Sequence, residues 1–340
     1  MKFVCTNCFA DEEINNFILS QNNIGKCSFC NSTDIEVINI EEIFDFFNEL
    51  LSNFKLKTDG KSLISIIQNN WNLFEGNDIG IKILNYSIGK ISKNFQNAEV
   101  LVDFNDDIIE NVSYWNTLKY KLKWEKRYLT EIAFIVEDLG WDSFFSSQIQ
   151  INNKDRFYRA RVHSNHNLAK FKPTEMFCPP KEITTAGRAN PLGIPYLYLC
   201  DNKDTPLYEI RATYLDEVSV GTFKLNNIQD KISISDFTET PNLYSPGLIN
   251  RIIKSTLLKQ EISKDLSKPI RRYDSEIDYV PTQFICEFIK EITGVYGLKF
   301  QSSLHKEGKN IVIFDQKIMK CTKVNKIKIT KINLDSENFE

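Results

Sequence analysis

The sequence predicts an α+β protein made of three successive parts. Near the N-terminus, four cysteines form two Cys-x-x-Cys pairs at the spacing of a zinc ribbon. Apolar residues then recur at helical spacing until about residue 150. The rest of the chain mixes short apolar runs with helical stretches, which is typical of a mixed α/β arrangement. We therefore expect domains over residues 1–38, 39–150 and 151–335.

The two cysteine pairs predict the first domain. Cys5 and Cys8 are separated from Cys27 and Cys30 by 18 residues, so two knuckles can surround one Zn²⁺ with four thiolates. No histidine or aspartate is needed, which makes the predicted site closed and structural. A redox role is disfavoured because no thioredoxin-like pattern surrounds either pair. So short a ribbon has little core, and we expect the metal to supply folding free energy.

Two amphipathic stripes predict the helical second domain. Further helices are expected near residues 79–95 and 112–138, with turns near Gly76 and Gly89. Asp59 is a plausible N-cap for the second stripe, and the region should hold four or five helices. The first stripe contains Ile43, Phe47, Leu50, Leu51 and Phe54, and the second contains Leu63, Ile64, Ile67, Trp71 and Phe74.

The third domain should alternate strands and helices. A helix from Thr205 to Tyr214 is expected, capped by Asp204, with Pro206 in its first turn. A later helix begins at Pro281 and should end at Gly294. Strands are predicted over residues 157–162, near 218–222 and 232–234, over 311–314 and near 324–332, and another helix should end near residue 262.

Arginine is concentrated between residues 156 and 211, in a chain whose other basic residues are mostly lysine. Arginine suits a planar or bidentate anion. A tight turn, Gly187-Arg188-Ala-Asn190-Pro-Leu-Gly193, precedes an apolar run over 196–199 that reads as a buried strand. One carboxylate, Glu209, follows shortly afterwards. The pattern indicates an anion-binding site next to a single acidic group.

These blocks resemble, in order, the RES-domain family, which is named for its Arg, Glu and Ser. The resemblance rests on Phe157-Tyr158-Arg159, the turn around Arg188, the strand with Tyr198, Glu209, and the late Gln301-Ser302-Ser303 before an apolar strand. It implies a fold similar to ADP-ribosyltransferases and an activity that consumes NAD, as in known members that are bacterial toxins with antitoxins. It also implies a helical domain likened to HEPN nucleases. Arg127 has no histidine at nuclease spacing, so we expect that domain to be non-catalytic.

The resemblance also implies roles for particular residues. Glu209 would stabilise the cationic ribose when nicotinamide leaves. Arg159 and Arg188 would hold the pyrophosphate and the ribose, because both match the arginine positions of the family. Ser302 would complete the catalytic set. Binding roles fall to Tyr158, Asn190, Tyr198 and Ser303, with Tyr198 a candidate for stacking on nicotinamide, although core packing is the alternative for that ring.

Composition limits the partners and the location that can be expected for this protein. A net charge of −3 and a pI near 5.8 argue against nucleic acid as a partner. No apolar run reaches membrane-spanning length, so we expect a cytoplasmic protein without a membrane partner. Zn²⁺ is the predicted cofactor, NAD the substrate, and an antitoxin or activating protein the possible partner. Two alternatives remain: an ADP-ribosyltransferase that modifies a protein or nucleic acid, and a non-catalytic binding module.

Overall fold

The structure is a computed structural model that describes residues 1–145, 148–166, 168–226, 230–268 and 276–332. The chain forms two compact units. The N-terminal unit contains residues 1–116 and 239–259, and the sheet unit contains residues 117–238 and all residues from 260 onward. Two of the three borders fall inside long helices, α5 (Asp106–Trp124) and α8 (Ile249–Ser267), and the third lies between residues 238 and 239. The predicted end of the third domain, residues 333–335, lies outside the described residues.

The N-terminal unit begins with a three-stranded antiparallel sheet in the order β1-β3-β2. Its strands are β1 (Phe3–Cys5), β2 (Ile24–Gly25) and β3 (Ile35–Asn39). Helix α1 (Glu12–Ser20) occupies the spacer between the two cysteine pairs. The carboxylate of Asp11 caps this helix by accepting hydrogen bonds from the backbone N–H groups of Glu13 and Ile14. The predicted ribbon therefore carries a helix between its knuckles.

Three further helices, α2 (Phe44–Leu51), α3 (Leu63–Trp71) and α4 (Asn77–Ile91), follow the ribbon. Every residue of the two predicted apolar stripes is buried. Several expectations for this region were wrong. Phe54, predicted on a helical stripe, is the first residue of a strand, and the helix expected near residues 112–138 ends at Trp124. Asp59 lies in strand β4 (Phe54–Ser62), which pairs with β5 (Leu101–Phe104), and α3 begins only after Ser62. Gly89, where a turn was expected, lies inside α4. Its φ is not positive and no neighbouring atom crowds it, so the position has no need of glycine.

One hydrophobic core joins the ribbon, these helices and the segment 239–259. Leu243, Ile249 and Ile253 from that segment belong to the same buried cluster as the ribbon cysteines. The backbone N–H groups of Leu243 and Tyr244 donate to Asp11, which also caps α1. Glu49 accepts from the N–H groups of Gly247 and Ile249 at 2.7 and 3.0 Å. The N-terminal unit thus depends on residues from two distant parts of the sequence.

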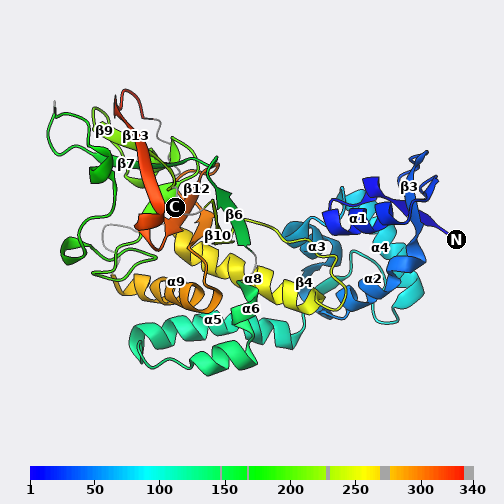
Figure 1. The fold of residues 1–340 in the computed structure, drawn as a ribbon. Helices are drawn as coiled ribbons and strands as arrows, with labels where there is room; N and C mark the ends of the chain where they lie inside the picture. Colours follow the sequence, from blue (N-terminus) through cyan, green and yellow to red (C-terminus); the bar gives the residue numbers. More distant parts are fainter. Residues whose placement is uncertain (146–147, 167, 227–229, 269–275, 333–340) are drawn as a thin grey trace, which may run out of the picture. The chain divides into compact units, whose positions relative to one another are not determined.

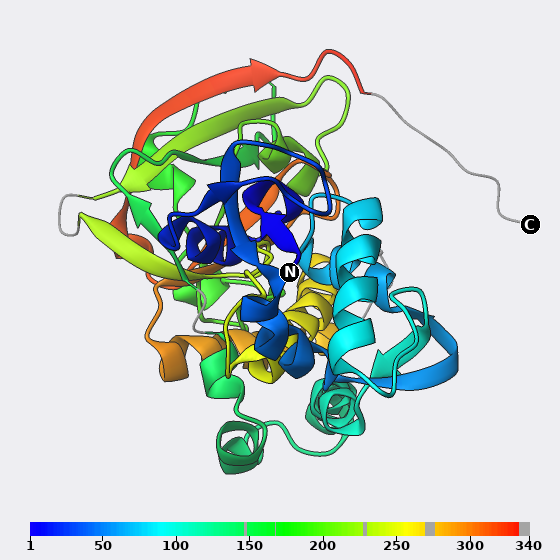
Figure 2. The same ribbon diagram turned by 90° about the vertical axis from the view of Figure 1, so that its right-hand side faces the viewer.

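The sheet unit contains an eight-stranded sheet in the order β13-β9-β7-β8-β12-β11-β10-β6. Neighbouring strands are antiparallel except the parallel pair β10–β11. Figure 2 shows β9 and β13 as long neighbouring strands, in agreement with their register. The strands are β6 (Gln148–Asn152), β7 (Phe157–Val162), β8 (Leu197–Cys200), β9 (Glu217–Leu225), β10 (Lys231–Asp236), β11 (Gly297–Gln301), β12 (Lys309–Ile313) and β13 (Met319–Lys328).

Short helices connect these strands, and the longer α9 (Val280–Thr293) ends at Gly294 with φ 67°, as predicted (Figure 1). The others include a π-helix (Phe134–Asp138), α6 (Trp141–Phe144) and α7 (Thr205–Glu209). Helix α7 is shorter than predicted. Asp204 makes no side-chain cap, because Asn202 Oδ1 accepts from the N–H groups of Asp204 and Thr205 instead. Among the described residues, no helix is both long and apolar enough to cross a bilayer.

Candidate functional site

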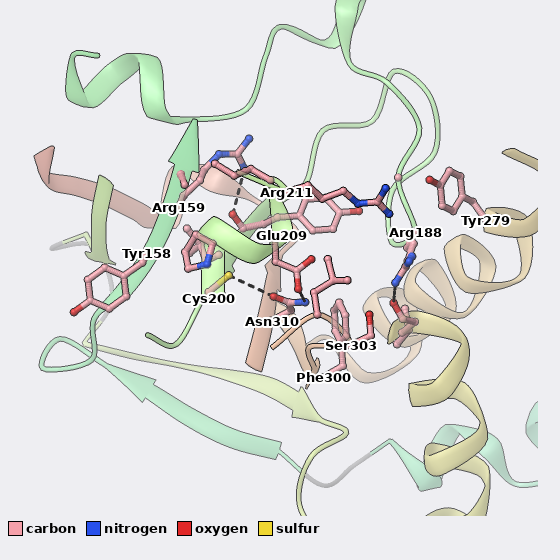
Figure 3. A pocket seen from close by; sticks show the side chains of 18 residues that line it. Tyr158, Arg159, Arg188, Cys200, Glu209, Arg211, Tyr279, Phe300, Ser303 and Asn310 are labelled. Carbon is pink, nitrogen blue, oxygen red and sulfur yellow. Dashed lines mark hydrogen bonds between the residues drawn. The ribbon is translucent and has the colours of Figure 1, made fainter. Parts of the chain in front are cut away.

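A cavity of about 410 Å³ opens in the sheet unit, beside β7, β8, β12 and the end of α7. Figure 3 shows the side chains around it. Six residues proposed from the sequence line this cavity: Tyr158, Arg159, Arg188, Tyr198, Glu209 and Ser303. Ser302 and Asn190 lie behind the lining and contact residues that form it. The fold therefore brings together side chains separated by more than a hundred residues in the sequence.

Glu209 is the last residue of α7, and its carboxylate points toward β12 (Figure 3). Its Oε1 atom accepts two hydrogen bonds, from Ser302 Oγ at 2.7 Å and from Asn310 Nδ2 at 2.8 Å. The start of the helix is also fixed, because Thr205 Oγ1 lies 2.8 Å from both Asn202 Oδ1 and His305 Nδ1. The carboxylate is therefore held at the cavity by both its own helix and the sheet.

The two candidate serines occupy different environments. Ser302 is buried, and its Oγ accepts hydrogen bonds from the backbone N–H groups of Leu304 and His305 at 3.2 and 3.1 Å. A hydroxyl has one hydrogen to donate, and Ser302 donates it to Glu209. Ser303 is exposed and lines the cavity directly. Of the two, only Ser303 has a place in the cavity wall, whereas Ser302 contacts Glu209.

Arg159 extends from β7 into the cavity wall. Its Nη1 donates to the carbonyl oxygen of Tyr198 at 3.2 Å, while its buried Nε has no hydrogen-bond partner among the described residues. Burial lowers the pKa of this guanidinium from its ordinary value. No carboxylate forms an ion pair with Arg159 in the part of the chain that the structure describes. A buried cation without an anion is costly unless a ligand supplies the negative charge.

Arg188 reaches the cavity from the turn at residues 187–193. Its Nη1 donates to the carbonyl oxygen of Leu266 at 2.8 Å, and burial lowers its pKa, while the nearby Tyr279 and Glu209 favour its charged form. Helix α9 holds the turn through its first residues. Thr282 Oγ1 donates to the carbonyl of Arg188 at 2.6 Å, and Gln283 Nε2 donates to the carbonyl of Gly187 at 2.8 Å. The backbone that presents Arg188 is therefore fixed.

Asn190 and Tyr198 stabilise the same turn from inside. Asn190 Nδ2 lies within 3.0–3.1 Å of three carbonyl oxygens, and its Oδ1 accepts from the Tyr198 hydroxyl at 2.8 Å. The Tyr198 oxygen in turn accepts from the N–H of Ala189 at 3.0 Å, and burial raises the pKa of this phenol. The amide of Asn190 is thus used within the turn, whereas the ring of Tyr198 remains part of the cavity wall.

Among the wall residues that sequence reasoning did not propose for the site are Cys200, Tyr279 and Asn310. Asn310 belongs to β12 and stands directly before the apolar run 311–314, but no role could be assigned to it from the sequence. Its strand partner in β8 is Cys200, whose Sγ donates to Asn310 Oδ1 at 3.4 Å. An asparagine directly before an apolar strand was the only available signal, and it gives no hint of a contact with Glu209.

The four N-terminal cysteines form a second candidate site. Their sulfur atoms all lie within 4.8 Å of one another. The separations are 3.8 Å for Cys5–Cys8, 3.4 Å for Cys5–Cys30 and 3.5 Å for Cys8–Cys27. Four sulfurs at about 2.3 Å from one tetrahedral Zn²⁺ would be about 3.8 Å apart, close to these distances. The cluster therefore fits a zinc ribbon.

Arg127, the arginine considered for a nuclease motif, contributes to the end of α5. Its Nε donates to the carbonyl of Leu122 at 3.2 Å and its Nη2 to that of Lys123 at 3.4 Å. These are the unpaired carbonyls that remain at any helix C-terminus. In this arrangement the guanidinium caps a helix.

The cavity thus defines an α+β protein with an arginine-lined pocket and one anchored carboxylate. Residues 156–335, slightly more than half of the chain, match the RES domain, and the chain belongs to the RES-domain family. Among solved structures, it is similar to a chain of the M. tuberculosis MbcT–MbcA toxin–antitoxin complex, with 14% identity and a TM-score of 0.31. That alignment covers 56% of this chain and 92% of the other. No curated protein matches the chain.

Proposed function

We propose that this protein is an NAD-consuming enzyme of the toxin type. It would break the bond between nicotinamide and ribose and transfer the ADP-ribosyl group to water or phosphate. The observation that carries the proposal is the Glu209 carboxylate, held through one oxygen at a cavity whose wall contains Arg159 and Arg188. The resemblance to NAD-consuming members of the RES family supports the same reaction.

The chemistry suits a single anchored carboxylate. Nicotinamide leaves as a neutral pyridine, so little acid catalysis is needed, and the main barrier is the cationic character of the departing sugar. A fixed negative charge lowers that barrier most when it does not have to reorganise during the reaction. The hydrogen bonds from Ser302 and Asn310 hold Glu209 in this way. Glu209 would face the ribose, and Ser302 would act by holding it.

The arginines suit the charged part of the substrate. The pyrophosphate of NAD carries two negative charges and accepts bidentate hydrogen bonds. Arg159 and Arg188 have no carboxylate partner within hydrogen-bonding distance among the described residues, and Arg159 Nε has no partner at all. We propose that these two side chains bind the pyrophosphate and the adjacent ribose.

Three further wall residues have proposed binding roles. The ring of Tyr198 would lie against nicotinamide, since its hydroxyl is already fixed by Asn190. Tyr158 and Ser303, both in the wall, would contact the rest of the substrate. Asn190 would act through the turn that presents Arg188, because its amide hydrogens point to backbone carbonyls.

The proposal also covers the other parts of the chain. A structural Zn²⁺ would bind Cys5, Cys8, Cys27 and Cys30, and the residues up to about 150 would form a ribbon and a non-catalytic helical region. An antitoxin or activating protein would be the partner, as the family resemblance implies, and the protein would act in the cytoplasm.

The test is release of nicotinamide from NAD by the purified full chain, with and without phosphate. We expect Glu209→Gln to lower the rate by roughly a thousandfold, the effect of removing a fixed transition-state charge. Glu182→Gln is the matched control, because Glu182 is an exposed glutamate of the same unit that does not line the cavity. Dependence on phosphate would identify phosphate as the acceptor.

NAD labelled in its adenylate part distinguishes the macromolecular alternative. Label that stays in small molecules supports hydrolysis or phosphorolysis, whereas label on protein or nucleic acid supports ADP-ribosyl transfer to a macromolecule. Nicotinamide release that is equal in wild type and Glu209→Gln would rule out the role of Glu209. No release from folded, zinc-loaded protein in any condition would favour a non-catalytic binding module.

A further inference from the structure

We propose that Asn310 is a positioning residue for the reaction: it fixes one oxygen of Glu209 so that the other faces the ribose. This inference rests on the proposed function and deepens it. It assigns a role to a residue for which the sequence predicted none.

Both hydrogen bonds to Glu209 end on the same atom. Ser302 Oγ and Asn310 Nδ2 donate to Oε1 at 2.7 and 2.8 Å, whereas Oε2 has no hydrogen-bond partner among the described residues. Each carboxylate oxygen has two lone pairs, so two donors can occupy both acceptor sites of Oε1 while those of Oε2 stay open. Two donors on one oxygen fix the direction of the second, which remains available at the cavity that Glu209 lines.

The orientation of the Asn310 amide follows from its neighbours. If the amide were reversed, Oδ1 would face the Glu209 carboxylate, and two acceptors at that distance repel each other. In the observed orientation, Nδ2 donates to Glu209 while Oδ1 accepts from Cys200 Sγ at 3.4 Å (Figure 3). Both ends of the amide are therefore satisfied, and the donor is directed at the carboxylate.

The sheet gives Asn310 a rigid position. It pairs with Cys200 of β8 on one side and with Phe300 of β11 on the other, so its strand lies between two neighbours. Glu209, in contrast, ends a helix of five residues, and Arg211 just beyond it adopts a φ of 51°. So short a helix has little stability of its own. The contacts of Thr205 fix the start of this helix, and the strand fixes the carboxylate at its end.

The residue type also favours this role. Asparagine is disfavoured within strands, and a buried or half-buried amide must find partners for its polar atoms. An apolar side chain at position 310 would continue the core strand at Ile311 without this requirement. The chain instead places a donor beside Glu209, at the wall of the cavity.

A double-mutant cycle in the full chain tests the proposal. The loss of a hydrogen bond to a charged group predicts that Asn310→Ala lowers kcat by about ten- to a hundredfold. The KM for NAD should change by only a few fold, because Asn310 would touch the carboxylate and not the bound substrate. Asn310→Asp keeps the shape but replaces the donor with a negative charge, so its kcat should fall further than that of Asn310→Ala.

In a Glu209→Ala background, Asn310→Ala should cause no additional loss of kcat, because a residue that acts through Glu209 has nothing left to position. Asn325→Ala and Asn325→Asp are the matched controls. Asn325 is an exposed asparagine of β13 in the same sheet, outside the cavity, and these changes should leave kcat and KM unaltered.

The same cycle, measured by chemical unfolding, separates failure of this inference from failure of the proposed function. Asn310→Ala should destabilise the wild type more than the Glu209→Ala variant, whether or not NAD is consumed. Additive losses of stability would mean that the two side chains are not coupled, and would overturn the inference. So would an unchanged kcat in Asn310→Ala, a rise in KM alone, or an equal loss of kcat in both backgrounds. Absence of nicotinamide release by wild type, with coupling retained, would overturn only the proposed function.

Discussion

The cysteine cluster and the Glu209 cavity assemble their polar side chains in opposite ways. The cluster takes its four sulfurs from between residues 5 and 30, at two short and regular spacings. The cavity takes Arg159, Arg188, Glu209 and Asn310 from different strands, a turn and a helix. In the first case, ligand type and spacing define the site. In the second, the sheet register defines it, and only the complete fold can bring the groups together.

This difference has an energetic side. A zinc ribbon gains its folding free energy largely from the metal, so its stability should depend on four side chains. The cavity depends on many individually modest hydrogen bonds, each contributing about 0.5–1.5 kcal/mol, or about 1.5–3 when one partner is charged. A single substitution should therefore cause a large loss of stability at the cluster, and a smaller loss, which depends on the hydrogen bonds removed, at the cavity. Four predictions, from the largest effect to the smallest, test this contrast.

Removal of one cysteine ligand should have the largest effect. Cys27→Ser should release Zn²⁺ and lower the unfolding free energy of the N-terminal unit by more than about 4 kcal/mol. Metal analysis and hydrogen exchange over residues 1–116 and 239–259 provide the measurement. Cys321→Ser, at a half-buried cysteine of β13 outside the cluster, should leave the metal content unchanged. Unaltered zinc and melting in Cys27→Ser would disprove the ribbon.

Asp11→Ala should come second. Its carboxylate accepts from the N–H groups of Glu13 and Ile14 in α1 and of Leu243 and Tyr244 in the distant segment. The loss of this shared acceptor should cost about 2–4 kcal/mol in chemical unfolding of the N-terminal unit. The exposed Asp59 serves as control, since Asp59→Ala should change stability by less than about 0.5 kcal/mol. Equal losses of stability in the two variants would show that the hydrogen bonds of Asp11 to α1 and to the segment 239–259 do not stabilise the N-terminal unit.

Gly187→Ala should have an intermediate effect, confined to the cavity. A Cβ there would lie 2.5 Å from Asn190 Oδ1 and 2.7 Å from the Tyr198 hydroxyl, so the hydrogen bond between them must break or shift. We expect a destabilisation of about 1–3 kcal/mol. Displacement of Arg188 should lower nicotinamide release by up to about a hundredfold. Calorimetry and kinetics measure the two effects.

Gly89→Ala is the control for that change. A Cβ at Gly89 meets no atom within 4 Å, and alanine in this last turn of α4 should be neutral or stabilise by up to about 0.5–1 kcal/mol. If Gly187→Ala behaves like Gly89→Ala in both stability and turnover, the turn does not control the position of Arg188.

Cys200→Ser should have the smallest effect. The thiol donates to Asn310 Oδ1, and a serine hydroxyl can make the same hydrogen bond with a shorter reach. Stability should change by no more than about 1 kcal/mol, and kcat by a few fold at most. A loss of activity comparable to that of Asn310→Ala would show that the thiol itself takes part in the reaction.

The sequence was most informative where chemistry or periodicity acts locally. The cysteine spacing, the buried stripes and the strand Phe157–Val162 all follow from patterns within short segments, and the structure has them. Local capping was less predictable. From their residue types, Asp204 and Asn202 could each cap α7. In the structure the side chain of Asn202 accepts the hydrogen bonds from the backbone N–H groups of Asp204 and Thr205.

Groups that meet across strands could not be found in this way. The contact between Asn310 and Glu209 depends on the pairing of β8 with β12, and a shift of one residue would turn Asn310 to the other face of the sheet. The membership of residues 239–259 in the N-terminal unit was equally hidden, because their apolar pattern does not identify the core that they join. The family resemblance located Arg159, Arg188 and Glu209, but it contains no information on these pairings.

The shared core of the N-terminal unit limits which fragments and chimaeras of this protein can fold. The family match over residues 156–335 includes a segment whose apolar side chains, among them Leu243, Ile249 and Ile253, are covered by residues 1–116. A fragment limited to the RES domain would leave that surface bare and prone to aggregation. Exchange of the N-terminal region between relatives would require a matching exchange of residues 239–259, so we expect the two stretches to be inherited together.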